Sequence, residues 1–268
     1  MVAASKLRRS QEKIHQIRPF AGRLGTIISN LIAAVGSDTD QDWYTAKRPE
    51  NRILIVAITS DRGLCGAFNS IVLKATVKLV LEKYSTQFNN GNVTILPLGR
   101  RSMDYFSKRK YKCADSYWSI FGQLTFANVA QAGEYIIETY KQGGYDKVEI
   151  VYNEFKNVAT QVLKIEQFLP LAVNATTAKN SPDYIFEPNA EELLGGLIPQ
   201  LLNVQLFRSV LESNAAEHAA RMTAMDKASE NAGELLKELK LVYNRSRQAA
   251  ITKEILEIVG GAEALKSS

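Results

Sequence analysis

Histidine and cysteine are scarce in this sequence, and their scarcity excludes most catalytic and metal-binding chemistry. The two histidines, His15 and His218, and the two cysteines, Cys65 and Cys113, lie far apart in the chain. The cysteines lack the CxxC spacing of zinc sites and are too few for a disulfide framework. HExxH, GxSxG and metal-spaced acidic clusters are also missing. The sequence therefore predicts no catalytic residue and no metal ligand.

Long apolar runs are missing too. No segment approaches the roughly 20 apolar residues that a membrane-spanning helix needs. No apolar stretch follows the basic N-terminal segment MVAASKLRRSQEK, as a signal peptide would require. We expect a protein that does not span a membrane and is not exported.

Phosphate-binding glycine patterns are absent as well. The segment SDRGLCGAFNS (60–70) follows an apolar run, where a phosphate loop would be expected, but it lacks the lysine of GxxxxGK[ST]. Its glycines, Gly63 and Gly66, also do not fit GxGxxG. We interpret them as turn residues that let a helix pack on a strand, and we expect no nucleotide or other cofactor.

Proline is absent from Gln200 to the end of the chain, which predicts one very long helix. Alternating steps of four and three from Leu211 to Ala250 meet mostly apolar residues, as in a coiled-coil seam. Many of these residues are small, which indicates a close partner helix. The positions between the seam residues are largely charged or polar and include Glu212, Glu217 and Arg221. The pair Gly260–Gly261 is of a kind that can stop a helix.

A second apolar seam runs from Leu7 to Leu31, so the two ends of the chain can pair as antiparallel helices. Pro19 interrupts this seam and should kink the helix or cost it a hydrogen bond. No capping residue precedes Val2, which predicts that the chain begins within a helix.

Between the two seams the pattern changes to short strands and helices. Strands are expected at 53–59, 93–98, 147–152 and 162–169, and helices at 70–84, 101–109 and 128–142. Residues 174–182 are expected to form a loop, and Pro188–Asn189 to start the last helix. We predict a three-layer, Rossmann-like α/β domain inserted into an antiparallel two-helix coiled coil. The expected parts are a first helix at 1–45, the α/β domain at 50–188 and a C-terminal helix at 189–268 that pairs with 1–45.

Positive charge is concentrated in two blocks. Residues 1–25 hold six basic residues against Glu12 alone, and residues 100–112 hold six against Asp104 alone. Such blocks attract polyanions, anionic lipid or acidic proteins, and charge by itself does not choose among them.

Four segments carry a resemblance to a known family. They are MVAASKLRR (1–9), SDRGLCGAFNS (60–70), ESNAAEHAARMTAMDKASENAGEL (212–235) and YNRSRQAAITKEILEIVGGAEAL (243–265). They closely resemble the gamma subunit of the bacterial and mitochondrial-type ATP synthase catalytic head, and the bacterial members more than the mitochondrial ones. The resemblance covers essentially the whole chain. Met1 matches an internal methionine of the family's first helix, which implies a shortened start.

In that family the terminal helices form an antiparallel coiled coil, and the C-terminal helix reaches up the axis of a ring of three alpha and three beta subunits. The resemblance implies that the α/β domain docks the shaft on the epsilon subunit and the membrane c-ring. It implies a non-catalytic rotor shaft that couples proton-driven rotation to ATP synthesis or hydrolysis, with the catalytic sites on the beta subunits. The implied location is peripheral, on the cytoplasmic face of the bacterial inner membrane.

The resemblance also assigns partner contacts. The catch-loop residues, which match positions that contact a catch loop of a beta subunit, are Arg247, Gln248 and Thr252. The N-terminal cations, which match a basic stretch that faces acidic lever segments of the beta subunits, are Lys6, Arg8 and Arg9.

Two other classes of protein stay open. A coiled-coil scaffold or nucleic-acid binder would use the basic blocks on phosphate, and Tyr105, Phe106 and Tyr111 interleave with the cations of the second block. A cysteine-dependent enzyme would use Cys65 at its strand-to-helix turn, although such chemistry usually needs a nearby histidine. The small-residue C-terminal helix favours the shaft, because a helix that turns inside a close sleeve needs a slim surface. We therefore expect no nucleic-acid partner.

Overall fold

The computed structural model describes residues 2–35, 42–46, 48–114, 116–171 and 189–266. The chain divides into two compact units, Met1–Thr223 and Ala224–Ser268, and each is described by itself. The predicted loop at 174–182 and the predicted helix start at Pro188 lie outside the described residues.

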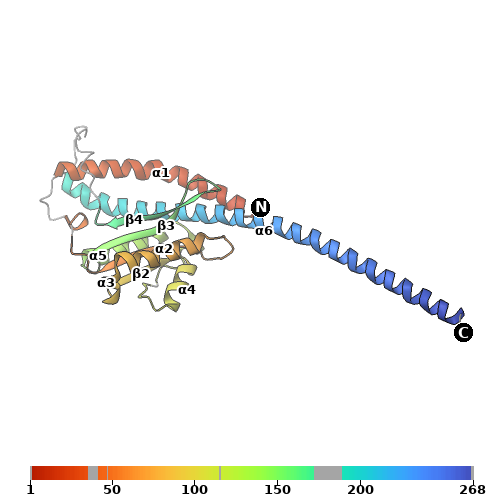
Figure 1. Ribbon diagram of the computed structural model, residues 1–268. Helices are drawn as coiled ribbons and strands as arrows, with labels where there is room; N and C mark the ends of the chain where they lie inside the picture. Colours follow the sequence, from red (N-terminus) through yellow and green to blue (C-terminus); the bar gives the residue numbers. More distant parts are fainter. Residues whose placement is uncertain (1, 36–41, 47, 115, 172–188, 267–268) are drawn as a thin grey trace. The chain divides into compact units, whose positions relative to one another are not determined.

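A mixed β-sheet forms the centre of the first unit (Figure 1). Its strand order is β2-β1-β3-β4. The strands are β1 (Ile53–Ile58), β2 (Val93–Leu98), β3 (Lys147–Phe155) and β4 (Gln161–Leu169). β1 runs parallel to β2 and β3, with Ile53 opposite Val93 on one side and Lys147 on the other. β4 runs antiparallel to β3, so the sheet ends in a hairpin.

Helices cover both faces of this sheet, which explains why every residue of β1 is buried. Side chains alternate between the faces of a strand. Leu54, Val56 and Ile58 therefore enter one core, with α5 (Phe126–Lys141) and the two terminal helices. The alternate residues of β1 enter a second core with α2 (Phe68–Lys83) and α4 (Arg100–Lys108). Three short elements complete the domain: η1 (Asp42–Tyr44), α3 (Ser85–Asn89) and η2 (Ile120–Gln123).

The two terminal helices, α1 (Val2–Val35) and α6 (Ala190–Lys266), pack antiparallel within the first unit (Figure 1). Leu7, near the start of α1, shares a core cluster with Leu211 of α6. Leu31, near the end of α1, shares another with Leu194, which comes early in α6. Ser10 Oγ donates a hydrogen bond to Asn214 Oδ1 at 2.7 Å. The predicted fold class, an α/β domain inserted between the helices of an antiparallel coiled coil, is confirmed.

The start of α6 agrees with the prediction, and the helix runs past the glycine pair at 260–261. The backbone N–H of Glu192 donates to Asn189 Oδ1 at 2.7 Å, so Asn189 caps the helix. The helix then passes Pro199 and continues through Gly260–Gly261 to Lys266, so the glycine pair does not stop it. Neither glycine adopts the positive φ that ends a helix at a glycine. Pro19 likewise lies inside α1 without ending it.

The second unit is helical, and its side chains are exposed from residue 225 to residue 263. Several of these side chains are large and apolar, among them Leu235, Leu236, Leu239, Leu241, Val242, Ile255, Leu256 and Ile258. In the predicted seam, Leu211 and Ala215 are buried, whereas the residues from Met225 onward are exposed.

Candidate partner-binding surfaces

The N-terminal cations lie on the exposed side of α1. Leu7 is buried in the coiled-coil core, and Lys6, Arg8 and Arg9 around it are exposed. Lys6 and Arg9 are three residues apart and share one face of the helix, whereas Arg8 lies on the opposite flank. Arg8 Nε is 3.3 Å from Glu12 Oε1 in an exposed ion pair. All three cations are therefore accessible to a partner, and their contact with acidic segments stays a prediction.

The catch-loop residues belong to the second unit and are exposed on α6. Thr252 Oγ1 donates to the main-chain oxygen of Gln248 at 2.9 Å, which fixes the hydroxyl one helical turn beyond Gln248. Arg247 forms no ion pair with any described residue. Its guanidinium is therefore free for a carboxylate of another chain, and that contact stays a prediction.

An ion pair joins α1, α6 and the end of β3. Arg18 Nε and Nη2 donate to the two carboxylate oxygens of Glu212 at 2.7 and 2.8 Å. Arg18 Nη2 also donates to the Phe155 carbonyl oxygen at 2.9 Å, and the Phe155 N–H donates to Glu212 Oε2 at 3.2 Å. The hydrogen bonds to Glu212 raise the pKa of Arg18. These charge-assisted bonds attach the sheet to both helices of the coiled coil.

A second junction, the Arg221 clamp, joins α6 to the glycine loop 60–70. Arg221 Nη1 donates to the carbonyl oxygen of Gly63, and Nη2 lies 3.4 Å from the carbonyl oxygen of Arg62. Nη2 also pairs with the Glu217 carboxylate. The loop turns through two left-handed residues, Leu64 at φ 62° and Gly66 at φ 58°. The glycine loop, which has no lysine for binding phosphate, thus contacts α6 through its main-chain carbonyl oxygens.

The charged residues Glu212, Glu217 and Arg221, which lie between the seam positions, are largely covered. Glu212 is 2% exposed and Glu217 is 8% exposed. The physical reason is that this part of α6 packs against α1 on one side and against the glycine loop and β3 on another. Burial raises the pKa of Glu217, and Arg221 opposes that shift. The alanines between these charges, in ESNAAEHAAR, were the sequence signal of a second covered face.

Cys65 belongs to the same loop and is 1% exposed. Asn69 Nδ2 donates to its sulfur at 3.2 Å. Burial raises the pKa of the Cys65 thiol, whereas a nucleophilic cysteine needs a lowered pKa. The site therefore does not favour the cysteine-enzyme alternative.

The aromatic rings of the basic block at 100–112 already pack against other side chains of this protein. The Arg109 guanidinium lies 3.7 Å from the centroid of the Tyr105 ring. Phe106 is buried, and the Tyr111 ring packs against Phe88 and Phe106 at centroid distances of 5.2 and 5.3 Å. A nucleic-acid binder would need free aromatic faces on which bases stack. This arrangement weakens the nucleic-acid alternative.

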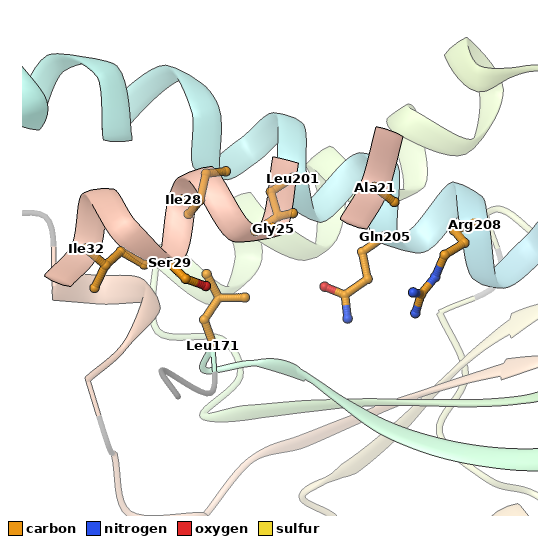
Figure 2. A pocket seen from close by; sticks show the side chains of 9 residues that line it. All are labelled: Ala21, Gly25, Ile28, Ser29, Ile32, Leu171, Leu201, Gln205 and Arg208. Atoms are coloured by element: carbon orange, nitrogen blue, oxygen red, sulfur yellow. The ribbon is translucent and has the colours of Figure 1, made fainter. Parts of the chain in front are cut away.

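A pocket of about 240 Å³ lies between α1, α6 and Leu171, two residues after the end of β4 (Figure 2). Its lining residues are Ala21, Gly25, Ile28, Ser29, Ile32, Leu171, Leu201, Gln205 and Arg208. Typical ligand pockets start at roughly 300 Å³. Arg208 Nη2, the charged group at one end, lies 3.3 Å from Glu166 Oε2. We therefore assign this pocket no ligand.

Within the described residues, no three histidine, cysteine, aspartate or glutamate side chains gather as a metal site. No helix in the described part of the chain combines the length and the apolar character needed to cross a membrane. The features that stand out are an exposed helix, accessible cations and two charged junctions that fix a sheet to a coiled coil. They define a class of protein that acts through a long helix and its contacts.

Comparison with known proteins agrees with this class. The sequence model of the ATP synthase family matches residues 1–265. The ATP synthase gamma chain of Cytophaga hutchinsonii is 51% identical over 271 residues, covering 100% of this chain and 92% of that protein. The gamma chain of Chlorobium limicola is 47% identical over 268 residues, covering 100% and 91%.

A solved structure of the Tetrahymena thermophila mitochondrial ATP synthase central stalk and c-ring contains a similar chain. It superposes with a TM-score of 0.62 at 26% identity, covering 85% of this chain and 96% of that one. The present chain therefore belongs to the ATP synthase gamma chain family.

Proposed function

We propose that this chain is the central rotor shaft of an ATP synthase, coupling proton-driven rotation of a membrane c-ring to ATP synthesis or hydrolysis in a ring of alpha and beta subunits. The observation that carries the proposal is the second unit. Its helix exposes large apolar side chains along its length, from Leu235 to Ile258. Exposed apolar surface of this extent marks an interaction site, and a surrounding ring of subunits would cover it.

The first unit supplies the features that a shaft needs at its base. Torque passes between distant sites only through parts that are rigidly connected. The Arg18–Glu212 pair and the Arg221 clamp both join the α/β domain to α6. The domain would thus turn together with the helix. In this arrangement 1–45 and 189–268 form the shaft, and 50–188 forms the domain that docks on the epsilon subunit and the c-ring.

The finer parts of the proposal follow the family. The chain would bind no catalytic nucleotide of its own, and the catalytic sites would lie on the beta subunits. Arg247, Gln248 and Thr252 would contact a catch loop of a beta subunit. Lys6, Arg8 and Arg9 would face its acidic lever segments, where exposed ion pairs are weak enough to break and re-form during rotation. The complex would lie at the cytoplasmic face of a bacterial inner membrane.

The test is a pull-down of the chain, tagged on its α/β domain, from its native membrane extract, with mass spectrometry and an ATPase assay of the eluate. We expect alpha, beta and epsilon subunits with ATPase activity. Arg247→Ala combined with Gln248→Ala should lower that activity about tenfold, which corresponds to ~1.4 kcal/mol in the barrier.

The matched control is Lys237→Ala combined with Glu238→Ala, two adjacent exposed polar residues of the same helix. It should keep the activity of the unaltered complex. Recovery of the chain alone, or with RNA, would overturn the proposed function. Equal loss in both double variants would overturn the specific role of Arg247 and Gln248.

A further inference from the structure

We propose that the basic surface around α4 docks an acidic polypeptide segment of a partner protein. This basic surface consists of six exposed cations: Arg100, Arg101, Lys108, Arg109, Lys110 and Lys112. They lie on α4 and just after it, and Phe106 of α4 packs in the core cluster that also contains residues of α2. The inference concerns the α/β domain, which the proposed function docks on other subunits, and it does not depend on the contacts of the coiled coil or of the second unit.

Most of these cations have no anion of their own. Arg100 Nε lies 3.9 Å from Asp104 Oδ2, a loose and exposed contact. None of the other five cations forms an ion pair with a described residue. Arg109 uses the face of its guanidinium on the Tyr105 ring, which leaves N–H groups at its edge for an acceptor. The surface therefore holds uncompensated positive charge that a partner could neutralise.

The cations lie in two groups, one at the start of α4 and one that begins at its last residue, Lys108. A rise of 1.5 Å per residue separates Arg100 from Lys108 by about 12 Å along the helix. One phosphate or one free carboxylate cannot reach both groups. A polymer with several negative charges can contact both at once.

Three features favour a polypeptide over a nucleic acid or a lipid surface. Asp104 lies between the two groups and would repel a uniformly anionic polymer, whereas a protein segment can place a lysine or arginine opposite it. The rings of Tyr105 and Tyr111 are packed against other side chains, so no base can stack on them. No large apolar side chain of residues 99–113 is exposed for insertion into a bilayer.

The backbone that carries the cations is well fixed. The Tyr111 N–H donates to the Phe106 carbonyl oxygen at 3.1 Å. The Ile95 N–H of strand β2 donates to the Lys112 carbonyl oxygen at 2.8 Å, and the Ala114 N–H donates back to Ile95 at 2.8 Å. The segment after α4 is thus bonded to the edge of the sheet. Binding at a pre-formed surface costs little backbone ordering.

The experiment measures fluorescence anisotropy of a labelled, glutamate-rich peptide with one central lysine, titrated with the full chain at low salt. The variant Lys108→Gln, Lys110→Gln and Lys112→Gln leaves Arg109 on its ring. We expect it to bind the peptide at least about tenfold more weakly, or ~1.4 kcal/mol. The control is Lys237→Gln, Lys240→Gln and Lys253→Gln, which removes the same number of exposed lysines from α6 and should bind as the unaltered chain does.

Two competing ligands and one further variant decide the chemistry of the partner. Tighter binding of oligouridylate RNA or of phosphatidylglycerol vesicles through the same lysines would overturn the proposal, as would equal losses in both triple variants. The unaltered chain should prefer the lysine-containing peptide to an all-glutamate peptide, and Asp104→Asn should abolish that preference. If the unaltered chain does not prefer the lysine-containing peptide, the proposed docking of a polypeptide with a basic residue opposite Asp104 is overturned.

Discussion

His218 is a neutral histidine in a charged neighbourhood. Its Nδ1 is buried and has no hydrogen-bond partner among the described residues. Burial, and then the nearby cations Lys6 and Arg221, lower its pKa from 6.5 to about 4. Because the folded pKa lies below the unfolded one, the neutral imidazole favours folding. Its contribution is complete above pH 6.5 and is lost as the pH falls toward 4.

We expect His218→Gln to flatten this acid dependence. Between pH 7 and pH 4 the unaltered chain should lose on the order of 3 kcal/mol more stability than the variant, since each pH unit between the two pKa values is worth about 1.4 kcal/mol. Urea unfolding at several pH values measures the difference. The raised pKa of Glu217 acts in the opposite direction in both proteins. Parallel pH profiles would contradict the assignment to His218.

Gly133 is a glycine that packing requires. A Cβ at this position of α5 would lie 2.0 Å from Asn203 Oδ1 of α6. Gly133→Ala should therefore destabilise the chain by about 1–3 kcal/mol, the usual cost of overpacking, as measured by thermal unfolding.

Two variants control for this effect. Gly22→Ala lies on the exposed side of α1 with nothing within 4 Å of its Cβ, and it should gain up to ~1 kcal/mol from helix propensity. Adding Asn203→Ala to Gly133→Ala should recover part of the loss. Failure of that recovery would show that the Asn203 side chain is not the obstacle.

At the scale of elements, the Arg18–Glu212 pair has unequal partners. The Glu212 side chain is 3% exposed and the Arg18 side chain is 42% exposed. Removing the cation leaves a buried carboxylate without compensation, whereas removing the carboxylate leaves a guanidinium that water can still reach. We expect Arg18→Met to cost about 3 kcal/mol and Glu212→Gln clearly less, measured by urea unfolding with a double-mutant cycle. Equal costs would contradict this asymmetry.

The elements of the α/β domain could be predicted because their patterns are local. The β2 strand was predicted at its observed limits, since β-branched and apolar residues fill Val93–Leu98 between turn residues. The end of α6 could not be predicted from Gly260–Gly261, because a glycine permits a helix to end without forcing it to.

The candidate surfaces were predictable only where side chains are exposed. The positions of Lys6 and Arg247 follow from helix periodicity and resemblance alone. The inward positions of Glu212 and Arg221 depend on which element covers α6, and periodicity along one helix does not contain that information. Arg221 binds main-chain carbonyl oxygens, which every residue has, so the side chains of the loop do not indicate this contact.

At the scale of the whole molecule, the two units should differ in local stability. The helix of the second unit has exposed side chains from 225 to 263 and therefore few contacts that oppose local unfolding. Limited trypsin digestion of the isolated chain should cut first after its exposed basic residues, Lys227, Lys237, Lys240, Arg245, Arg247 and Lys253, as mass spectrometry of early fragments would reveal. First cuts within α1 or the strands would contradict this order, and assembly with alpha and beta subunits should protect the same sites.

The Arg221 clamp also bears on how this family can change over evolutionary time. The guanidinium binds main-chain oxygens, so it recognises the path of the loop and ignores the side chain at Arg62. The clamp therefore sets no requirement on the side chain at position 62. A Cβ at Gly63 would lie 2.9 Å from Arg101 Nη2, but this is the tip of an exposed side chain that can move aside. The Arg221 clamp can thus be retained while side chains beside it are substituted.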